Sequence, residues 1–241
     1  KPTAEYDPAG FEEFLGIARG TGLLPEQVYV LQGLTDLRDL LAFGPAEGCS
    51  SFIVAPDRSA TGCLLLGQNW DLQTDHMPFV RLLHRKPSAG PETWSVTLTG
   101  CLTLIGLNAE GLAVGNTNLM TRDARVGVQY LSVLHRALNA STFEEAAAAI
   151  REAPRAGAHY YYLGGPNGRA TGFECSATKV RNFEVTSGTF VHCNHALHKD
   201  IAALEVEQPS VSTAHGQVRL TELLEQHREP LGGPAIELPA G

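Results

Sequence analysis

Apolar residues near the start of the chain follow a helical spacing. The spacing runs from Gly10 to Leu41 and is interrupted at Gly20-Thr21-Gly22. Pro25 stands near the beginning of the second helical stretch, where its missing N–H costs little. The segment is therefore predicted to be a hairpin of helices.

The pattern changes after residue 50 to short apolar or alternating runs separated by Gly, Pro and Asp, which is typical of β-strands. The expected strands in this part are Ser51–Ala55, Cys63–Leu66, Phe79–His84, Trp94–Leu98, Leu102–Leu107 and Leu112–Val114. Asn108-Ala109-Glu110-Gly111 has turn composition and is expected to join the last two strands as a hairpin.

Helices and then strands are predicted for the rest of the chain. Helices are expected over Gln129–Asn139 and Thr142–Glu152, the second opened by a capping box of Ser141 and Glu144, and a last helix near Gln217–Gln226. The later strands are His159–Leu163, Ala170–Cys175, Lys179–Val185 and Thr189–Asn194. Helices segregated from antiparallel strands indicate an α+β fold, with two sheets packed face to face between helical layers in an αββα sandwich.

Composition narrows the class of protein. The 241 residues can bury a full core, and 43% hydrophobic with 18% charged residues is ordinary for a globular protein. A net charge of −8 without a basic stripe argues against nucleic acid as a partner. No apolar run reaches the roughly 18 residues of a membrane span. The five cysteines include no C-x-x-C pair, so a disulfide scaffold is not expected and a cytoplasmic location is the default.

The pair Gly48-Cys49 is the leading candidate for chemistry. It separates a polar, turn-like segment from the apolar run that starts at Phe52. A thiol titrates near pH 8.5 and needs a base, and an N-terminal nucleophile uses its own α-amino group, which titrates near 8. That arrangement requires removal of everything before Cys49, and a glycine at 48 has no side chain to obstruct attack on its carbonyl. The sequence therefore suggests self-cleavage between Gly48 and Cys49.

Several blocks in order along residues 10 to 225 carry a family resemblance. They are the helical segment Phe14–Gly22, Gly48-Cys49-Ser50-Ser51, Gly67-Gln68-Asn69-Trp70-Asp71, the hairpin Asn108–Val114 with Asn116-Thr117-Asn118, Phe173-Glu174-Cys175 and Cys193-Asn194-His195. Together they resemble the acyl-coenzyme A:isopenicillin-N (6-aminopenicillanic acid) acyltransferase family, a cysteine-type branch of the N-terminal nucleophile (Ntn) hydrolases.

The resemblance implies roles for individual residues. Cys49 would attack an amide or thioester carbonyl, and its freed amine would carry the proton. Asp71 would hold that ammonium by a charge-assisted hydrogen bond. Asn118 and Asn194 would present amide N–H groups to the developing oxyanion, with Asn116 competing for the role of Asn118.

It also implies an organisation. Residues 1–48 would be a helical pro-segment that becomes the α-subunit, and residues 49–241 the catalytic β-subunit of one structural domain, leaving a heterodimer after cleavage. Asn69, Trp70, Asn116 and His195 would lie at the substrate pocket. The partner would be a small-molecule amide or acyl donor, with no cofactor. Related bile-salt and penicillin V hydrolases carry an arginine where Gln68 stands, which favours the acyltransferase branch.

Other interpretations of the same residues remain open. The family has a serine–arginine element where Ser210–Thr213 stands without arginine, so a non-catalytic binding protein on this scaffold is one alternative. A conventional hydrolase pairing Cys49 with His192 or His195 is another. Zinc could use Cys193 and two histidines, but His192 and Cys193 would point to opposite faces of a strand, and no metal is expected.

Overall fold

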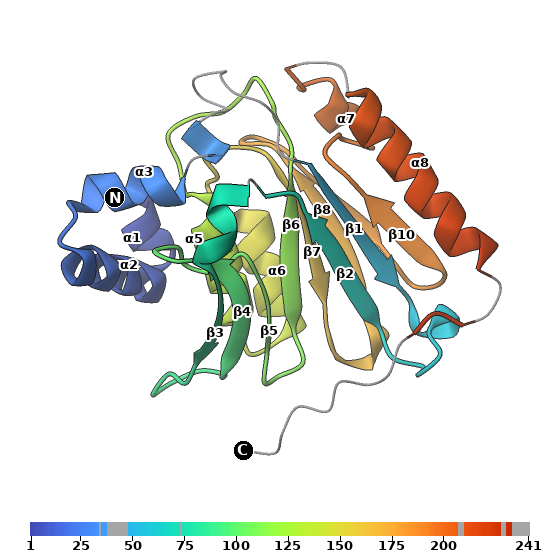
Figure 1. Ribbon diagram of the computed structural model, residues 1–241, viewed down its shortest axis with the longest axis horizontal. Coiled ribbons are helices and arrows are strands. Elements are labelled where there is room, and N and C mark those ends of the chain that lie inside the picture. The colour runs from blue at the N-terminus through green and yellow to red at the C-terminus, as the bar shows by residue number, and fades with distance from the viewer. Residues whose placement is uncertain (34, 38–47, 73, 207–209, 228–229, 233–241) are drawn as a thin grey trace.

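Two antiparallel sheets form the centre of the protein in the computed structural model, which describes residues 1–33, 35–37, 48–72, 74–206, 210–227 and 230–232 (Figure 1). The larger sheet has the strand order β3 (Val80–Arg85), β4 (Thr93–Leu98), β5 (Ile105–Asn108), β6 (Ala113–Asn118), β7 (His159–Gly164), β8 (Ala170–Cys175), β9 (Val180–Glu184). The smaller sheet has the order β10 (Thr189–His192), β1 (Cys49–Val54), β2 (Leu65–Trp70).

Helices cover the outer faces of both sheets. Figure 1 shows α8 (Val211–Gln226) on the outer side of the smaller sheet, and α5 (Tyr130–Leu138) and α6 (Phe143–Glu152) on the larger one. Other helices with bounds in the described residues are α1 (Pro2–Tyr6), α2 (Pro8–Thr21), α3 (Pro25–Gln32) and α7 (Lys199–Ala202), with 3-10 turns η1 (Pro56–Arg58), η2 (Thr74–Phe79) and η3 (Pro166–Gly168). The order helix, sheet, sheet, helix confirms the predicted αββα sandwich.

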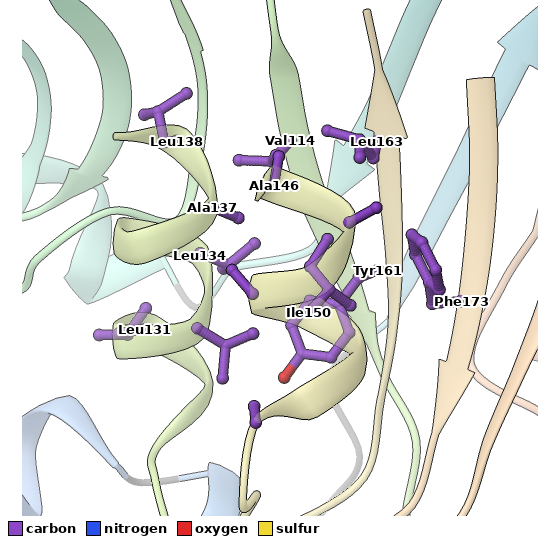
Figure 2. Close-up of a cluster of buried hydrophobic side chains, with 14 of the residues drawn as sticks. Val114, Leu131, Leu134, Ala137, Leu138, Ala146, Ile150, Tyr161, Leu163 and Phe173 are labelled. Carbon is purple, nitrogen blue, oxygen red and sulfur yellow. The ribbon is translucent and has the colours of Figure 1, made fainter. Parts of the chain in front are cut away.

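Strand β7 shows how the sequence fills two cores at once. Its side chains alternate, so Tyr161 and Leu163 pack toward α5 and α6 in the cluster of Figure 2. Tyr160 and Tyr162 point the other way, into the core between the sheets with Ile53 of β1. The tyrosine run is thus core on both faces, and full burial of an apolar side chain such as Leu163 stabilises the fold by roughly 1.5–3 kcal/mol.

Element boundaries differ from the sequence pattern at several places. The capping box of α6 is Thr142 with Glu145, not Ser141 with Glu144, because the helix starts at Phe143 and the extended residue before it is Thr142. Strand β2 starts two residues later than expected and includes the polar Gln68-Asn69, since pairing with β1 continues to Trp70.

The C-terminal helix is longer than its apolar spacing predicted. Helix α8 starts at Val211, where the Ser210 side chain accepts a hydrogen bond from the Thr213 N–H. At the other end of the chain, α2 ends at Gly22 with a left-handed φ of 70°, and α3 begins at Pro25. The last residues of the predicted helical hairpin, 38–41, lie outside the described residues.

Polar contacts tie residues before Cys49 to α5, α6 and β3. The Tyr6 hydroxyl donates to the Ala149 carbonyl of α6 at 2.6 Å, and the His135 ring of α5 contacts the Asp7 carboxylate at 2.8 Å. The Arg85 guanidinium on β3 contacts the Glu13 carboxylate at 2.7 Å. A break in the chain at Gly48–Cys49 would leave all these contacts intact.

Candidate active site

The pairing of β1 with β2 determines the surroundings of Cys49. Cys49 lies opposite Trp70 in the register, so Gly48 and Asp71 are the next neighbours across the two strands. The Asp71 backbone N–H donates to the Gly48 carbonyl oxygen at 2.9 Å. The carbonyl of the Gly48–Cys49 bond is therefore polarised by a backbone donor before any chemistry begins.

Close approach of the Asp71 side chain explains the glycine at 48. A Cβ atom built on Gly48 would lie 2.1 Å from Asp71 Oδ2, far inside van der Waals contact. The carboxylate of Asp71, an exposed residue, thus lies directly against the Gly48 backbone. Any larger residue at 48 would displace that carboxylate from the Gly48–Cys49 bond.

Asn194 approaches Cys49 from the β10 side of β1, whereas Asp71 approaches from the β2 side. Strand β10 pairs with β1, Ser51 lying opposite His192, and the loop after β10 carries Asn194 to the start of β1. The Cys49 backbone N–H donates to Asn194 Oδ1 at 2.5 Å, and Asn194 Nδ2 donates to the Asn118 carbonyl at 2.9 Å. In the uncleaved chain Asn194 therefore faces Cys49 with its carbonyl oxygen, and its role as an oxyanion donor stays a prediction.

A small cavity of about 40 Å³ opens beside Cys49. Its described lining combines apolar and polar side chains from both sheets and from the helices: Thr35, Cys49, Gln68, Trp70, Leu104, Ile105, Asn116, Asn118, Tyr130 and His159. Asn116 and Asn118 both line it because residues two apart on β6 share a face. Within the described residues, the buried Asn118 Oδ1 has no hydrogen-bond partner.

Of the other residues expected at the substrate pocket, Trp70 is among the described lining residues of this cavity, and Asn69 and His195 are not. Asn69 is an exposed residue of β2, and the substrate-binding roles of Trp70 and Asn69 stay predictions. The His195 ring lies 3.2 Å from the Thr213 hydroxyl of α8, and burial lowers the pKa of that ring.

Gln68 links the two sheets next to the nucleophile candidate. Its Nε2 donates to the Asn116 carbonyl at 2.8 Å, and the Tyr162 hydroxyl donates to its Oε1 at 3.0 Å. Burial, reinforced by the nearby Cys49, raises the pKa of Tyr162, so the phenol stays a neutral donor. The sequence pattern gave no sign of this link, because Tyr162 has the spacing of an ordinary core residue.

His192, one of the two histidines that the Cys–His alternative requires, is engaged elsewhere. His192 is completely buried, its Nε2 lies 2.9 Å from Glu174 Oε1, and its Nδ1 lies 2.8 Å from the Cys193 carbonyl. Neither ring nitrogen is available to Cys49. No group of three or more His, Cys, Asp or Glu side chains within the described ranges could hold a metal ion.

Comparison with known proteins finds one family for most of the chain. Residues 58–238 match the family model described as acyl-coenzyme A:6-aminopenicillanic acid acyl-transferase. No curated protein matches the chain in sequence. Among the helices in the part of the chain that the structure describes, none has both the length and the apolar character needed to cross a membrane.

One solved structure of low sequence identity shares the fold, and two others superpose less well. A Caenorhabditis elegans orthologue of N-acylethanolamine-hydrolyzing acid amidase superposes with a TM-score of 0.52 at 12% identity, covering 75% of this chain and 80% of its own. A mutant conjugated bile acid hydrolase from Clostridium perfringens gives 0.46 at 14% identity, covering 63% and 54%. Penicillin V acylase from Agrobacterium tumefaciens gives 0.34 at 12% identity, covering 59% and 44%.

Proposed function

Because the chain belongs to the acyl-coenzyme A:6-aminopenicillanic acid acyltransferase family, we propose that it is a self-processing enzyme of the Ntn-hydrolase type with Cys49 as nucleophile. Its substrates would be small amides or thioesters, cleaved through an acyl-enzyme on the thiol. The observation that carries this proposal is the pair of contacts at the Gly48–Cys49 peptide bond. The Asp71 N–H donates to the Gly48 carbonyl oxygen, and the Cys49 N–H donates to Asn194 Oδ1.

Self-cleavage would use groups already in contact with that bond. The Cys49 thiol attacks the Gly48 carbonyl carbon, and the Asp71 N–H at 2.9 Å stabilises the negative charge that develops on the carbonyl oxygen. The C–N bond then breaks, the Cys49 nitrogen takes up the thiol proton and becomes an amine, and Gly48 is left as a thioester. Water hydrolyses the thioester and frees the thiol.

Turnover would repeat the same chemistry on a substrate. The α-amino group of Cys49 takes the thiol proton during attack and returns it to the leaving group. Asp71 would hold the new ammonium, a role supported by the position of its carboxylate against Gly48. The acyl group would enter the cavity beside Cys49, where Trp70 and Ile105 offer apolar surface. The choice between water and an amine as acyl acceptor follows from access to this cavity.

The intact mass of the purified protein tests the proposal. Cleavage should divide the 241-residue chain after Gly48, leaving a 193-residue piece that begins with Cys49. Cys49→Ala should remain one chain, and Cys49→Ser should cleave more slowly, since a hydroxyl is a weaker nucleophile. A wild-type protein that turns over acyl substrates while uncleaved would contradict the mechanism, and activity lost in His195→Ala would favour a Cys–His hydrolase.

A further inference from the structure

The loop that carries Asn194 is held by side chains instead of by a strand partner. Residues 193–198 after β10 are called here the Asn194 loop. Five of its backbone N–H groups donate to side-chain acceptors: Cys193 to Gln217 Oε1 (3.1 Å), Asn194 to Thr213 Oγ1 (2.9 Å), Ala196 to Glu205 Oε1 (2.8 Å), Leu197 to Glu174 Oε1 (2.5 Å) and His198 to Glu174 Oε2 (2.9 Å). These acceptors come from β8, from α8 and from the segment after α7.

Glu174 is the buried centre of this arrangement. Its side chain on β8 is completely buried and accepts from His192 Nε2 as well as from Leu197 and His198. Burial would raise the pKa of Glu174, but these donors outweigh it and keep the pKa below its usual range. The residue is therefore a carboxylate facing three donors, which an amide at the same place could not satisfy.

Thr213 connects the loop to the first turn of α8. Its hydroxyl accepts from the Asn194 N–H at 2.9 Å, while its own N–H is capped by Ser210. Thr213 is only partly buried, so its side chain can be changed with little effect on the core. This contact fixes the backbone of the residue whose side chain holds the Cys49 N–H.

We propose that Thr213 and Glu174 are positioning residues for Asn194, an inference that rests on the proposed function. Thr213 holds the backbone of Asn194 from one side, and Glu174 holds the loop three and four residues further on. The Asn194 carbonyl oxygen is thereby kept on the Cys49 nitrogen, with its amide on Asn118. A reacting group misplaced by about 1 Å can cost about a hundredfold in rate, so the loop's anchors control the chemistry at Cys49.

Self-cleavage of freshly folded precursor, followed by intact mass, tests this without knowledge of the substrate. Thr213→Val keeps the shape but removes the acceptor of the Asn194 N–H together with the contact to the His195 ring, and it should slow cleavage by about tenfold or more. Thr213→Ser should restore the wild-type rate to within about twofold, because it keeps the hydroxyl. Thr221→Val is the matched control, since its hydroxyl donates to the Gln217 carbonyl within α8 and makes no hydrogen bond with the Asn194 loop among the described residues.

The outcomes separate the two proposals. A precursor of Thr213→Val that melts like the wild type and cleaves slowly supports the positioning role, as does a larger loss in Glu174→Gln. Cleavage of Thr213→Val at the wild-type rate overturns it. So does a slow rate that Thr213→Ser fails to rescue, or that Thr221→Val reproduces, because either indicates a general role in stability. A wild-type chain that never cleaves contradicts the proposed function and this inference with it.

Discussion

Replacing Gly48 by alanine tests whether the Asp71 carboxylate acts on the Gly48–Cys49 bond. The new Cβ would lie 2.1 Å from Asp71 Oδ2. Van der Waals contact needs about 3.5 Å, so the carboxylate must retreat by about 1.4 Å. Because Asp71 is exposed, it can rotate away with little loss of folding stability.

The expected loss is in the rate of self-cleavage. In the proposed reaction the carboxylate holds the Cys49 nitrogen as it takes up the thiol proton. A hydrogen bond to a charged group contributes about 1.5–3 kcal/mol, and each 1.4 kcal/mol changes a rate by about tenfold. Gly48→Ala should therefore slow cleavage by roughly ten- to a hundredfold while the melting temperature stays close to that of the wild type. The assay is a time course of intact mass on precursor refolded from denaturant.

Two further variants decide the interpretation. Gly20→Ala is the matched control, since a Cβ on this α2 glycine would meet no atom within 4 Å, and it should cleave like the wild type. In an Asp71→Ala background, Gly48→Ala should cost little more, because the carboxylate is already gone. Wild-type cleavage by Gly48→Ala, or full additivity of the two substitutions, would refute the reasoning.

Three other predictions concern the contacts around the site. Burial alone would lower the pKa of His135, but Asp7 and Glu13 raise it from 6.5 to about 9. The stabilisation of the folded state by the charged His135 is therefore complete below pH 6.5 and is lost as pH rises through about 9. Melting temperatures measured across this range should show the fall, and His135→Asn should flatten it. Tyr162→Phe removes the donor to Gln68 Oε1 and should lower the free energy of unfolding by about 1 kcal/mol in urea titration, whereas an unchanged value would mean that the link contributes nothing. Asp36→Ala removes the acceptor of the Tyr130 N–H at the start of α5 and should lower the free energy of unfolding by about 1 kcal/mol in the same titration. An unchanged free energy would mean that this contact does not stabilise α5.

Local sequence was sufficient for most of the fold. Strand β8 has the predicted bounds, and α5 and α6 lie within a residue of theirs, because apolar periodicity reports directly which side chains are buried. Apolar periodicity failed for polar residues that belong to a strand because of their backbone hydrogen bonds. Gln68 and Asn69 belong to β2 because β1 supplies partners for their backbone, and no apolar pattern signals that pairing.

For the candidate site, too, the sequence determined one part and the tertiary structure another. The sequence by itself determined which residues to consider: Gly48 and Cys49 from their residue types, and Asp71, Asn118 and Asn194 from the family resemblance that the motifs carry. Only the tertiary structure decided how they meet. Strand register brings Asp71 to Gly48, and the β1–β10 pairing brings Asn194 to Cys49 across 145 residues. The hydrophobic pattern did not indicate the Tyr162–Gln68 hydrogen bond or the side chains that hold the Asn194 loop, because such contacts depend on packing between elements distant in sequence.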